Sequence, residues 1–89
     1  MTEFILTALT GDVSAFESAV SFNIAPRDRI KLAANVWFIE FDGKVQTLAE
    51  RLGLENGTQG HYVLASIGSV NGFVPNDVVH WINQHDPNG

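Results

Sequence analysis

The chain has no cysteine, and positive charge is scarce: five lysines and arginines stand against ten acidic residues among 89. Without cysteine, disulfides, thiolate metal sites and a cysteine nucleophile are excluded. The formal net charge of −5 repels phosphate backbones and anionic lipids. Binding to nucleic acid or to a membrane surface is therefore disfavoured, and the hydrophobic core alone must hold the fold.

Long apolar runs are also missing. No stretch approaches the roughly 20 apolar residues that a membrane-spanning helix needs, and the first three residues lack the basic region of a secretory signal. We therefore expect a cytoplasmic protein. A chain of 89 residues, 45% of them hydrophobic, suffices for one core and is too short for two, which predicts a single domain over residues 1–89.

The hydrophobic pattern predicts strands and helices in a definite order. Residues 3–9 are typical of a buried strand, and helical spacing over 14–22 indicates a helix. Alternation over 29–33, a reversal at 34–35 and the apolar run 36–41 indicate a hairpin. A second helix is expected over 45–52, a fourth strand over 61–67 and a short helix from 75 onward.

This order predicts an α+β fold of the ferredoxin-like kind: a βαββαβ antiparallel sheet with two helices on one face, plus an added C-terminal helix. Several local details follow. Asp12 or Ser14 can cap the first helix, with Glu17 completing a capping box, and Asn35 can take positive φ in the hairpin turn. Trp81 is expected to pack the last helix onto the domain.

Five segments resemble one family over nearly the whole chain. They are Phe4-Ile5-Leu6-Thr7, Val36-Trp37-Phe38-Ile39, Val45-Gln46-Thr47-Leu48-Ala49-Glu50-Arg51-Leu52, Tyr62-Val63-Leu64-Ala65-Ser66-Ile67 and Val79-His80-Trp81-Ile82. In this order they resemble the Cas2-like ferredoxin-fold proteins, most of all the small bacterial SinR-like group. These motifs are aliphatic and aromatic, so they describe a core more than a chemistry.

The resemblance implies a homodimer. In Cas2-like nucleases an aspartate at the end of the first strand can also hold a divalent cation across the dimer. That position falls at about Leu9, which offers no oxygen ligand. Asp12 is a weak catalytic substitute, with helix capping as its alternative role. The preferred function is a non-catalytic dimeric interaction module whose protein partner is unknown, and the alternative is a divalent-metal-dependent nuclease.

The fourth predicted strand offers an edge for the homodimer, because it is apolar and lacks the charges that protect an exposed edge. Its residues are His61, Tyr62, Val63, Leu64, Ala65, Ser66 and Ile67. Three of the five basic residues, Arg27, Arg29 and Lys31, lie close together in sequence. They form either a solvated strand face or a weak nucleic-acid contact.

No other pattern predicts a catalytic or cofactor site. His80 and His85 are five residues apart and point in different directions on a helix, so they and the nearby Asp77 and Asp86 do not indicate a metal site. Ser66 and Ser69 lack a nucleophile-elbow motif, and residues 68–72 lack the P-loop lysine. The tryptophans Trp37 and Trp81 are expected in the core rather than stacked on nucleobases. No cofactor is predicted.

Overall fold

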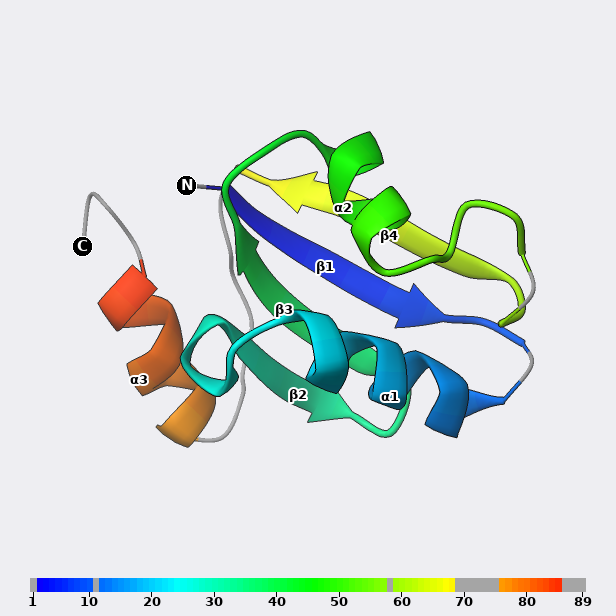
Figure 1. Cartoon of the computed structure of the whole chain (residues 1–89). Helices are drawn as coiled ribbons and strands as arrows, with labels where there is room; N and C mark the ends of the chain where they lie inside the picture. Colours follow the sequence, from blue (N-terminus) through cyan, green and yellow to red (C-terminus); the bar gives the residue numbers. More distant parts are fainter. Residues whose placement is uncertain (1, 11, 58, 69–75, 86–89) are drawn as a thin grey trace.

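A computed structural model of the chain shows a four-stranded sheet with helices on both faces (Figure 1). It describes residues 2–10, 12–57, 59–68 and 76–85. The elements, in chain order, are β1 (Thr2–Ala8), α1 (Val13–Asn23), the 3-10 turn η1 (Pro26–Asp28), β2 (Arg29–Ala33), β3 (Val36–Phe41), α2 (Val45–Arg51), β4 (Tyr62–Ile67) and α3 (Asn76–His85).

The strands lie in the order β2-β3-β1-β4, and every neighbouring pair is antiparallel. The predicted α+β class with an antiparallel sheet is confirmed. β1 is a central strand, as its apolar run predicts, since a strand with neighbours on both sides is the most buried. β2 and β4 form the two edges of the sheet.

One face of the sheet carries the main core together with α1 and α2. Alternate residues of β1, Phe4, Leu6 and Ala8, point to this face, and all three are buried. The register places Phe4 opposite Ile39 and Leu6 opposite Trp37. Helical spacing brings Phe16 and Val20 of α1 and Leu48 of α2 onto the same surface. The members of this cluster are Phe4, Leu6, Ala8, Phe16, Val20, Ile24, Trp37, Ile39, Leu48, Leu52 and Leu54.

The opposite face carries α3. Phe38 points away from its strand neighbours Trp37 and Ile39, and the Trp81 ring lies 6.2 Å from the Phe38 ring. The Trp81 Nε1–H donates to the Arg27 carbonyl oxygen at 3.0 Å. Trp81 is 7% exposed, so the predicted anchoring of the last helix is confirmed. No helix in the described part of the chain is long and apolar enough to cross a membrane.

Two predicted local details are wrong. Glu17 makes no capping box with Ser14; its carboxylate instead pairs with the Lys31 ammonium at 3.1 Å, on a strand 14 residues away. Asn35 does not take positive φ. Its side-chain amide donates to the Ala8 carbonyl at 3.0 Å, while its own carbonyl accepts from the Ala8 amide at 2.9 Å. Both residues serve long-range contacts that local sequence cannot reveal.

Candidate interaction surface

The β4 edge is the outer backbone of strand Tyr62–Ile67, which pairs with β1 alone among the described strands. The Ala8 amide donates to Asn35 in the hairpin turn before β3, and the Leu9 amide donates to His61 just before β4. The backbone N–H and C=O groups of even-numbered β1 residues therefore point toward β3, and those of odd-numbered residues point toward β4. Because the pairing is antiparallel and in this register, the backbone groups of odd-numbered β4 residues point toward β1. The backbone groups of Tyr62, Leu64 and Ser66 point outward.

The two sheet edges differ in their protection. β2 carries Arg29 and Lys31, and its pairing with β3 shifts register between Lys31 and Ala33. Charges and bulges are the usual devices that keep an edge strand from pairing with another chain. β4 has no charged residue from Tyr62 to Ile67. The β4 edge is thus the less protected of the two.

Beside this edge lies an apolar surface that we name the open half-face. It is formed by odd-numbered residues of β1 and β4 on the face that carries α3, together with Leu9, which follows β1 and whose amide donates to the His61 carbonyl. The strand residues are Ile5, Thr7, Val63, Ala65 and Ile67. Leu9 is 58% exposed and Val63 50% exposed. The register places Ile5 opposite Ala65 and Thr7 opposite Val63, so the surface is continuous across the two strands.

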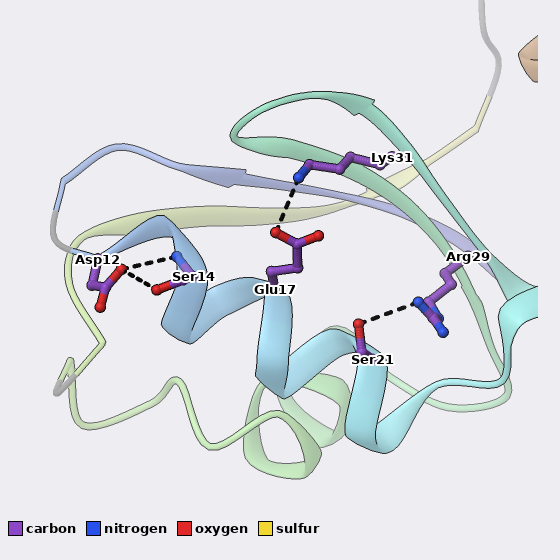
Figure 2. A network of polar contacts seen from close by, with 6 residues as sticks. All are labelled: Asp12, Ser14, Glu17, Ser21, Arg29 and Lys31. Carbon is purple, nitrogen blue, oxygen red and sulfur yellow. Dashed lines mark hydrogen bonds and ion pairs between the residues drawn. The ribbon is translucent and has the colours of Figure 1, made fainter.

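Arg29 and Lys31 lie on the face that carries α1, and both are engaged with that helix (Figure 2). The Arg29 guanidinium donates to the Ile24 carbonyl at 2.9 Å and to the Ser21 hydroxyl at 3.3 Å. Lys31 pairs with Glu17 and lies 5.8 Å from the centre of the Trp37 ring. These contacts tie α1 to the β2 edge.

Arg27 lies apart in η1, exposed to solvent, and its backbone carbonyl holds Trp81. The structure therefore gives the three basic residues two separate structural settings. The tryptophans have core roles, because Trp37 is 3% exposed and Trp81, on α3, is buried against Phe38 of β3. Neither ring can stack on a nucleobase without leaving its packing.

Asp12 is the N-cap of α1. Its Oδ1 accepts hydrogen bonds from the Ser14 amide at 2.9 Å and from the Ser14 hydroxyl at 2.5 Å (Figure 2). These bonds, with a smaller one from the Ala15 amide, hold the pKa of the Asp12 carboxyl below its ordinary value of 3.8. Leu9, where the family resemblance places an acid, is an exposed leucine just after β1.

This capping geometry predicts a pH-dependent contribution to stability. Because the folded-state pKa lies below the unfolded one, the unfolded chain binds the proton more readily, and the contribution is present above about pH 4 and lost as pH falls below it. Asn caps helices as well as Asp but does not titrate. Urea melts at about pH 6, 4 and 3 should therefore show the parent losing stability relative to Asp12→Asn as the solution is acidified.

Ser14→Ala is the matched control, because it removes the hydroxyl donor while the Ser14 backbone amide remains. It should reduce the pH-dependent difference between the Asp and Asn caps. If the parent and Asp12→Asn lose stability in parallel down to about pH 3, Asp12 does not cap α1 as described.

The described part of the chain contains no group of three His, Cys, Asp or Glu side chains placed to hold a metal ion. His80 is exposed and its Nε2 lies 3.1 Å from the Gln84 amide nitrogen. The His61 amide donates to the Thr10 hydroxyl at 3.0 Å. Ser69, Asp86 and the side chains of Asp77 and His85 lie outside the described residues.

The open half-face was missed by sequence reasoning that treated residues 3–9 as one buried apolar run. The sequence signal for this surface is the alternation within that run: Ile5, Thr7 and Leu9 occupy the odd positions, between the buried residues Leu6 and Ala8. Neither the protein-family models nor the curated proteins with which the chain was compared give a match. The function must therefore be argued from the surface itself.

Proposed function

We propose that this protein is a non-catalytic dimeric interaction module of the Cas2-like kind, closest to the SinR-like proteins, in which two copies pair through the β4 edge. The observation that carries the proposal is an edge strand of six residues with no charged side chain and with outward backbone groups at Tyr62, Leu64 and Ser66. Such an edge is a ready template for a second strand.

The fold supports the family part of the proposal. The strand order β2-β3-β1-β4, with α1 and α2 covering one face, is the arrangement expected of the split βαβ ferredoxin-like topology. In that topology β1 and β3 lie in the centre, and the last strand lies at an edge beside β1. The added helix α3 leaves this edge uncovered, because it packs on β2 and on Phe38 of β3.

Two β4 edges are self-complementary in antiparallel pairing about a twofold axis at Leu64. Leu64 then faces its own copy, and Tyr62 of each chain faces Ser66 of the other. All three positions carry outward N–H and C=O groups, so the pairing forms about six backbone hydrogen bonds. The result is an eight-stranded sheet that keeps α1 and α2 of both copies on one side.

Charge also favours contact at this edge. Each copy carries a net charge of −5, so two copies repel one another at long range. A stable contact is best placed where charged side chains are absent. β4 satisfies that condition, whereas a β2–β2 contact would place Arg29 and Lys31 of the two copies close together.

A metal-dependent nuclease is the alternative, and it would have to work from Asp12. The Asp12 carboxylate already accepts two hydrogen bonds from Ser14 as a helix cap. Arg29 and Lys31, which would have to hold phosphate, are engaged with α1. A hard cation needs several oxygen ligands together, and among the described residues no group of three His, Cys, Asp or Glu side chains includes Asp12.

Sedimentation equilibrium of the purified chain tests the proposal. At micromolar concentration the protein should have twice the monomer mass of 9.7 kDa. Because the paired edges bury apolar side chains and backbone rather than ion pairs, added salt should not dissociate the dimer. A monomer at that concentration would remove the dimer and weaken the family assignment with it.

The same preparation should leave labelled single- and double-stranded DNA and RNA intact with Mg²⁺ or Mn²⁺. Asp12→Asn is the variant for this arm, because it keeps a capping side chain and removes the charge. Metal-dependent cleavage by the parent that is lost in Asp12→Asn would favour the nuclease over the non-catalytic module.

A further inference from the structure

We draw no further inference here: the strongest candidate, the open half-face of β1 and β4 beside α3, is an unpartnered apolar sheet surface, and nothing in the structure shows what covers it.

Discussion

Replacing Trp81 with alanine is expected to lower the free energy of unfolding by roughly 3 to 5 kcal/mol. The indole is almost wholly buried, packs on Phe38 and donates to the Arg27 carbonyl. Its removal leaves a cavity beneath α3 and exposes Phe38 to water. Domains of this size have a total stability of only about 5 to 15 kcal/mol, so urea melts should show a large fall in the midpoint.

Trp81→Phe is the matched control. It keeps an aromatic ring over Phe38 but removes the Nε1–H that Arg27 accepts, so it should cost the loss of one hydrogen bond and part of the ring, about 1 to 2 kcal/mol. The ordering parent, Phe variant, Ala variant tests the contact directly. Equal midpoints for the parent and Trp81→Ala would show that α3 is not docked on the sheet.

The elements and their order could be predicted because each depends on local pattern. The alternation in residues 29–33 and the helical spacing of Leu48 and Leu52 are visible without tertiary information. The central place of β1 also follows from its apolar run. The end of α2 could be predicted from Gly53, because Gly53 has φ +69°, a conformation that favours glycine after a helix.

The side of the sheet that α3 covers was not predicted, although the sequence of β3 indicates that both faces of this strand are covered. Trp37, Phe38 and Ile39 are consecutive and all buried. Because successive residues of a strand point to opposite faces, a run of this kind requires a layer on each face. α1 and α2 supply the first layer and α3 the second, which is why Trp81 meets Phe38 rather than the main core.

Side-chain partners were the least predictable feature. Glu17 fits a capping box by spacing, yet in the structure it pairs with Lys31, which comes close only when β2 packs beside α1. The basic residues 27–31 suggested a charged face, but spacing alone could not show that Arg29 is engaged with Ile24 and Ser21. The uncharged β4 edge was predictable, because the absence of charge is a property of sequence.

In β4 the backbone N–H groups of even-numbered residues point outward and those of odd-numbered residues point toward β1, so one substitution can test the proposed dimer. Ser66 is exposed and its N–H points away from β1, so proline there removes no bond within the monomer. In the twofold pairing, the Ser66 N–H of each copy donates to the Tyr62 carbonyl of the other. Ser66→Pro therefore deletes two intermolecular hydrogen bonds and places a ring in the contact. Dimer association should weaken by roughly 100-fold, measured by sedimentation equilibrium.

The neighbouring position is the control, because it has the opposite parity. The Ala65 N–H points toward β1, so Ala65→Pro breaks a bond of the monomer's own sheet and should lower the unfolding midpoint strongly. Ser66→Ala should change neither property. A folded monomer from Ser66→Pro together with a destabilised Ala65→Pro requires an exposed β4 edge that carries the dimer. A Ser66→Pro protein that stays dimeric would reject the twofold pairing about Leu64, because that pairing uses the Ser66 N–H of both copies.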